Sequence, residues 1–112
     1  EGALGVITQA WMRLQGRPRF KATASIKFTN FFDAAQAVRA VSQAGLYPAN
    51  VRIVDGVETL VNGASDGSFT LMVVSFESAD HPVDAWMQRA LECCADLKIA
   101  VPRYGVASSQ VR

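Results

Sequence analysis

The chain has 112 residues, which gives room for one domain with a single hydrophobic core. Half of the residues are apolar, which excludes a disordered chain, and no apolar run is long enough to span a bilayer. The net charge of +1 gives no electrostatic footprint for nucleic acid. Two cysteines cannot build a disulfide framework, and a single histidine excludes a His-based metal cluster or triad. A reducing, cytoplasmic setting is therefore expected.

The first residues read as a unit of their own. Gly2–Leu14 carries two glycines and then β-compatible residues with apolar side chains on both alternating sets, which predicts a strand covered on both faces. Gly16-Arg17-Pro18 interrupts this pattern, because proline lacks a backbone N–H and restricts the residue before it to extended geometry. We therefore expect a domain border there, with residues 1–16 in one unit and 17–101 in the next. Residues 102–112 show no apolar periodicity and are expected to be a tail.

The following elements alternate between strands and helices. Lys21–Phe28 has a strict alternation that predicts a strand with one solvated face. Asn30 is the expected N-cap of a helix that Gly45 terminates. The remaining predicted elements are a strand over Val51–Val54, a short helix from Asp55 to about Gly63, a central strand over Phe69–Phe76, a helix after Asp80-His81-Pro82, and an edge strand over Ile99–Val101.

This order of elements predicts an α+β fold. With right-handed crossovers it folds most simply as a ferredoxin-like sandwich, an antiparallel sheet with its helices on one face. The leading strand, Gly2–Leu14, is an extra element that belongs to a neighbouring unit or pairs with a second copy of the chain.

The opening residues, Glu1-Gly2-Ala3-Leu4-Gly5-Val6-Ile7-Thr8, are the strongest candidate for a binding site. Glycines at this spacing let a ligand approach the backbone closely and present N–H groups to an anion. A tight turn before a strand accounts for the same spacing, so both interpretations stay open on the residues alone.

This segment resembles Glu-Gly-Thr-Leu-Gly-Val-Ile-Thr of the vanillyl-alcohol-oxidase-type flavoproteins. The resemblance implies that FAD is the cofactor and that Glu1, Gly2, Ala3, Leu4, Gly5, Val6 and Ile7 line it, mainly through backbone groups. Ala3 stands where the family commonly has threonine, which removes one hydroxyl. The stretch from Gln9 to Pro18 is similar to the strand and Pro-containing exit that lead into the C-terminal domain of FAD-linked oxidases.

Two downstream segments are similar to the alkylglycerone-phosphate synthase-like branch of these proteins. Pro48-Ala49-Asn50-Val51-Arg52-Ile53-Val54-Asp55 resembles Pro-Ala-Ser-Ile-Arg-Leu-Met-Asp, and Phe76-Glu77-Ser78 resembles Phe-Glu-Gly. The likeness covers roughly Glu1 to Leu97, and beyond Asp96 the chain departs from the Gly-Gly stretch of the family. The resemblance implies a catalytic role for Arg52, whose guanidinium suits a phosphate or another polar partner. The alternative is that Arg52 points outward and pairs with Asp55 or Glu58.

Other reactive residue types have structural explanations. Cys94 falls on the apolar stripe of the last predicted helix and Cys93 at its edge, with no metal-ligand spacing between them. Trp86 and Met87 fit the same stripe, which favours core packing over ligand contact. His81 is expected to be solvated at a helix start, and no metal site is expected. Arg17, Arg19 and Lys21 form a short basic cluster that is typical of a solvated edge.

Taken with the resemblance, these patterns predict a fragment of an FAD-dependent oxidoreductase or alkylglycerone-phosphate synthase-like flavoprotein. It would contribute part of the FAD site and of the domain that receives a small-molecule substrate, and the isolated chain is expected to be inactive. The alternative is a stand-alone ferredoxin-like ligand-binding or dimerisation module without catalysis, a homodimer formed through the N-terminal strand.

Overall fold

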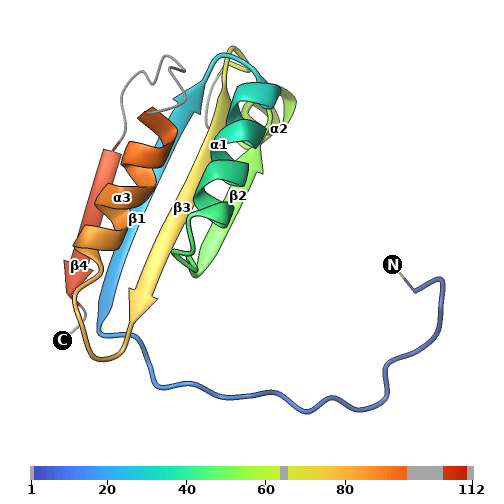
Figure 1. The fold of residues 1–112 in the computed structure, drawn as a ribbon. Helices are drawn as coiled ribbons and strands as arrows, with labels where there is room; N and C mark the ends of the chain where they lie inside the picture. Colours follow the sequence, from blue (N-terminus) through green and yellow to red (C-terminus); the bar gives the residue numbers. More distant parts are fainter. Residues whose placement is uncertain (1, 64–65, 96–104, 111–112) are drawn as a thin grey trace.

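The computed structural model describes residues 2–63, 66–95 and 105–110. A four-stranded sheet has the strand order β2-β3-β1-β4, and every neighbouring pair is antiparallel. Helices α1 and α3 lie side by side over one face of this sheet (Figure 1). The predicted ferredoxin-like α+β arrangement is therefore confirmed. The elements are β1 (Phe20–Phe28), α1 (Phe31–Gln43), β2 (Asn50–Val54), α2 (Gly56–Val61), β3 (Thr70–Ser78), α3 (Asp84–Ala95) and β4 (Gly105–Gln110).

The core lies between the sheet and the two long helices. Four alternate side chains of β1 are at most 1% exposed, as its sequence pattern predicts. β3 supplies the facing row, since Phe76, Val74 and Met72 pair in register with Ala22, Ala24 and Ile26 and are equally buried. The buried side chains of β1 are Ala22, Ala24, Ile26 and Phe28.

The opposite face of the sheet is covered by neither α1 nor α3, and we call it the open face. It carries the alternate residues of the same strands, and a salt bridge of 2.8 Å between Lys21 Nζ and Glu77 Oε1 joins two of them. The basic cluster expected near the border is thus partly paired. The described side chains of the open face are Lys21, Thr23, Ser25, Lys27, Asn50, Arg52, Val54, Leu71, Val73, Ser75 and Glu77.

Helix α1 begins where its capping residue predicts. The Asn30 side chain accepts a hydrogen bond of 2.9 Å from the backbone N–H of Asp33, which satisfies one of the free donors of the first turn. Ala34, Ala37 and Val41 are fully buried against the sheet. Phe31 is 49% exposed. As the first residue of the helix it extends past the covered part of the sheet.

Helix α3 covers the other half of the same face. Met87, Ala90 and Cys94 are at most 2% exposed, and Cys93 at 9% lies at the margin of the core, as predicted. Trp86 is 40% exposed, because only the edge of its ring packs on Phe76. Within the described ranges, no helix combines the length and the apolar character needed to cross a membrane.

One expectation about the ends of the chain was wrong, and another stays a prediction. Residues 2–18, which we call the arm, pair with no strand of this sheet and run away from it (Figure 1), so the strand expected over Gly2–Leu14, with a partner in a neighbouring unit or a second copy, stays a prediction. Residues 105–110, expected within a tail, form β4 and pair with β1 from Phe20 to Ser25. Pairing with a distant strand leaves no local periodicity in the sequence. The edge strand predicted over Ile99–Val101 lies outside the described residues.

Candidate functional site

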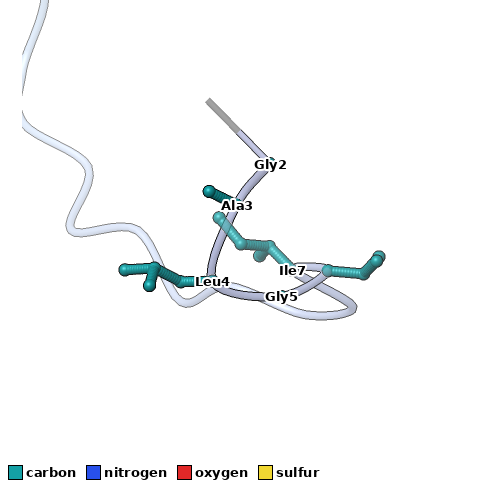
Figure 2. A pocket seen from close by; sticks show the side chains of 6 residues that line it. Gly2, Ala3, Leu4, Gly5 and Ile7 are labelled. Carbon is teal, nitrogen blue, oxygen red and sulfur yellow. The ribbon is translucent and has the colours of Figure 1, made fainter.

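The glycine-containing start of the arm curls around a hollow (Figure 2). The hollow measures about 530 Å³, and six consecutive residues, Gly2 to Ile7, line it. All six are exposed, and Leu4, Val6 and Ile7 are each at least 88% exposed. Since the hollow is lined by one short segment alone, it represents a single wall and not an enclosed pocket. Glu1, predicted to belong to this wall, lies outside the described residues.

This wall offers backbone groups and small apolar surfaces. Gly2 has φ +72°, a conformation that favours glycine, and nothing lies within 4 Å of a Cβ placed at Gly2 or Gly5. Between Gly2 and Ile7 no side chain carries a charge. A ligand here would be held by main-chain N–H and C=O groups and by van der Waals contact. These properties fit a cofactor such as FAD, provided that further residues complete the site.

Arg52 lies on the open face, in the middle of β2. It pairs in register with Val73 of β3, and its side chain is 60% exposed. Its Nη2 atom contacts Glu58 Oε1 of α2 at 2.5 Å. Of the two partners expected for an outward-pointing Arg52, the structure therefore selects Glu58. The ion pair with Glu58 uses the Nη2 group of Arg52, and the guanidinium has five N–H donors in all.

The neighbouring helix α2 is fixed at its start. Asp55 is its N-cap, and the Asp55 Oδ1 atom accepts a hydrogen bond of 2.7 Å from the backbone N–H of Glu58. Asp at this position, followed by Glu three residues later, is the spacing that predicts the helix start. The Glu58 carboxylate accepts a hydrogen bond from Arg52 of β2. The side chain of this glutamate therefore connects α2 to the sheet.

Two contacts link α2 to the segment before β3. The fully buried Thr59 donates from Oγ1 to the carbonyl of Gly56 in its own helix at 2.8 Å, and the same Oγ1 lies 3.5 Å from the carbonyl oxygen of Phe69. Gly56 also lies so close to Gly67 that only glycine fits there, since a Cβ on Gly56 would be 2.4 Å from the Gly67 carbonyl oxygen. Sequence reasoning did not identify this pair of glycines, because they are eleven residues apart along the chain.

The two predicted site components are not brought together in this chain. The hollow is lined by arm residues alone, while Arg52 belongs to the sheet. The arm leaves the domain near the end of β3, where the N–H of Arg19 donates to the carbonyl of Ser78 at 2.9 Å. From there it extends away from the sheet (Figure 1).

His81 forms a compact polar group at the turn before α3. Its Nδ1 atom lies 2.9 Å from Ser78 Oγ and 2.6 Å from Asp80 Oδ1, and its ring contacts the edge of Trp86. Hydrogen bonds from His81 and Ser78 lower the pKa of the Asp80 carboxyl. Both contacts use the same ring nitrogen, so the imidazole cannot relay a proton between serine and aspartate as in a nucleophilic triad. The group organises the turn.

The two cysteines are free and buried. Burial raises the pKa of the Cys94 thiol to about 11, with a smaller contribution from Cys93. A thiol with so high a pKa carries little thiolate at neutral pH and is a poor nucleophile. Among the described residues, no group of three His, Cys, Asp or Glu side chains could hold a metal ion.

The sequence matches one known protein family over most of its length. The family model for the C-terminal domain of FAD linked oxidases matches residues 17–109, which is most of the chain. The chain therefore belongs to the family of FAD linked oxidases, C-terminal domain. The match begins at residue 17.

Solved structures show the same fold. Two crystal forms of an alkyldihydroxyacetonephosphate synthase superimpose with TM-scores of 0.63 and 0.64 at 16% and 19% sequence identity. The superpositions cover 79% and 85% of this chain, which spans about a fifth of the length of those proteins, 20% and 22%. At this identity the likeness establishes the fold and not the substrate.

Proposed function

We propose that this chain forms the junction of an FAD-dependent protein. Residues 1–16 are the end of its FAD-binding domain, and the residues from 17 onward, β4 included, belong to its substrate domain. The observation that carries the proposal is the contrast between a folded domain of this family and an arm whose apolar side chains have no cover. Leu4, Trp11 and Leu14 are each at least 84% exposed, which is typical of a segment that packs elsewhere.

In this proposal the segment Glu1–Ile7 forms one wall of the FAD site. FAD supplies the exchange of electrons with substrate, and the chain's own residues bind and orient it. The positive φ of Gly2 and the open space at Gly5 keep the backbone accessible to the cofactor. One wall makes only a fraction of the contacts needed for tight binding, so the isolated chain neither retains FAD nor catalyses a reaction.

Arg52 is the proposed catalytic residue of the substrate domain. It projects from the open face with a positively charged guanidinium. A planar guanidinium binds phosphate or carboxylate through two parallel hydrogen bonds. A small oxygenated substrate that carries a phosphate, such as an acylated glycerone phosphate, is the substrate class that this residue and the synthase-like resemblance support together. In that branch the reaction is a net exchange of groups.

The flavin content of the protein that carries this chain tests the proposal. Gly2→Val adds a branched side chain at a positive φ and should lower the bound FAD per polypeptide severalfold, measured by visible absorption against protein mass. Ala3→Thr is the matched control, because it introduces the residue common in the resembling family, and it should leave the flavin content unchanged. Full flavin content in Gly2→Val would show that the arm does not line the FAD site.

The exposed arm also supports a second candidate, a dimerisation module. β2 and β4 are the edges of the sheet, and a strand from a second copy could pair with either. The mass of the isolated chain in solution, measured by light scattering, distinguishes the two. On this second candidate the chain is a dimer that becomes monomeric when residues 1–16 are deleted. A cytoplasmic location is proposed with either candidate.

A further inference from the structure

Arg52 needs a partner if its guanidinium is to have a defined position. Its side chain is 60% exposed and projects from a strand at the edge of the sheet. An arginine side chain without a partner has many accessible rotamers, so it would sample many positions over the open face. Productive orientation of a ligand requires the reacting groups to be held in a narrow range of geometry.

Glu58 is mounted on a short helix whose first turn is well fixed. The Asp55 cap binds the Glu58 N–H at 2.7 Å, the buried Thr59 hydroxyl bonds the Gly56 carbonyl within the helix, and Gly56 abuts Gly67 of the turn before β3. The carboxylate of Glu58 is therefore presented from a fixed backbone. It meets Arg52 at Nη2, and N–H donors of the guanidinium remain for a second anion.

We propose that Glu58 is a positioning residue that orients Arg52 over the open face, where Arg52 binds an anionic group of the substrate. The inference rests on the role proposed above for Arg52 and adds the residue that makes this role possible. Exposed ion pairs contribute little to stability. The main effect of Glu58 is therefore on geometry, and it can be separated from an effect on folding.

The orientation is measured first in the chain itself, without flavin. Nitrogen-15 NMR of the Arg52 guanidinium should resolve separate Nη signals, because the Glu58 contact slows rotation of the group. Glu58→Gln, which keeps the size of the side chain and removes its charge, should merge these signals, and Glu58→Asp should give an intermediate result. Glu92→Gln is the matched control, since it breaks another exposed ion pair, with Arg89 at 3.1 Å, on α3. Unchanged Arg52 signals in Glu58→Gln would overturn the inference.

The functional test uses the flavin-containing protein. Glu58→Gln should lower kcat/KM about tenfold to a hundredfold, the loss expected for a misplaced binding group, with unchanged flavin content and thermal stability. The double variant Arg52→Gln/Glu58→Gln should be no worse than Arg52→Gln alone, because the two residues act as one unit.

The outcomes separate the two proposals. If Arg52→Gln lowers kcat/KM and Glu58→Gln does not, the positioning role of Glu58 is wrong and the role of Arg52 stands. If Arg52→Gln retains full activity, the role of Arg52 fails, and the positioning role fails with it. Additive losses in the double variant would also contradict the positioning role.

Discussion

The backbone of Gly56 lies against that of Gly67, so close that a methyl group on Gly56 would be 2.4 Å from the Gly67 carbonyl oxygen. The Gly67 oxygen belongs to the backbone, and the position of a Cβ on Gly56 is set by the backbone. Neither atom could move aside as the end of a flexible side chain would. The contact joins the start of α2 to the turn before β3 and determines where Glu58 stands.

Gly56→Ala should therefore destabilise the domain. The clash forces a backbone shift of the kind that costs about 1–3 kcal/mol. Urea unfolding followed by circular dichroism measures the change in the free energy of unfolding. Gly16→Ala is the control, because a Cβ there meets Ala79 at an ordinary 3.8 Å, and its effect should stay within about 0.5 kcal/mol. Equal stabilities of the two variants would show that α2 and the turn separate freely.

Phe28, the last residue of β1, and Phe32, in the first turn of α1, should differ in how strongly their replacement by alanine lowers the stability of the domain. Phe28 is 0% exposed in the core, whereas Phe32 is 81% exposed. Phe28→Ala should cost about 3–5 kcal/mol in the free energy of unfolding, since it removes buried area and leaves a cavity. Phe32→Ala should change it by less than about 0.5 kcal/mol. A comparable loss in both variants, measured by chemical denaturation, would mean that Phe32 is covered in solution.

Removal of the α1 cap should have a smaller, local effect. Asn30→Ala removes the acceptor of the Asp33 N–H and should cost about 0.5–2 kcal/mol. Hydrogen exchange measured by mass spectrometry should localise the faster opening to the first turn of α1. Asn30→Ser keeps an acceptor for this N–H without placing a second carboxylate beside Asp33, and it should retain most of the stability. The cap interpretation fails if serine is as destabilising as alanine.

Stability should fall at alkaline pH because of Cys94. Burial raises the pKa of its thiol from 9.0 to about 11 in the folded chain. Between these two values the unfolded state binds fewer protons than the native state, so the free energy of unfolding decreases as the pH rises from 9 to 11. Below this window the effect is absent. Urea titrations across the window measure the slope.

The control for this pH dependence is Cys94→Ala, which lacks the titrating group. It should start from a lower stability, because alanine leaves a cavity, but its curve should be flatter from pH 9 to 11. The native protein should also resist alkylation of Cys94 by iodoacetamide at neutral pH. Rapid labelling of the folded chain there would show that the thiol is accessible and that burial does not control its pKa.

Local patterns in the sequence predicted much of the fold. The alternation of Ala22, Ala24, Ile26 and Phe28 identified the buried face of β1, and Asn30 identified the start of α1, because both signals act within a few residues. The tail expected at β4 was wrong, and the strand expected in the arm stays a prediction, for one reason. Whether a segment is a strand depends on a partner far away in the chain or outside it, and its own residues do not show that partner.

The candidate site residues were also predicted from local signals, but the contacts between them were not. The resemblance singled out Arg52, and the spacing of Asp55 and Glu58 predicted a helix start. Neither indicated that the Glu58 side chain would cross to Arg52, because that contact depends on how α2 is seated on Gly67. The arrangement of Gly2–Ile7 and Arg52 around one ligand stays a prediction, since the two lie apart in this chain.

The most direct test of the central claim is the ratio of FAD to polypeptide in the protein that carries this chain, measured by visible absorption and intact mass on one purified sample. Membership of an FAD-dependent protein, with Gly2–Ile7 as one wall of the site, predicts about one FAD per polypeptide and a severalfold loss in Gly2→Val. A protein without flavin absorbance, or a Gly2→Val variant with full flavin content, would contradict it.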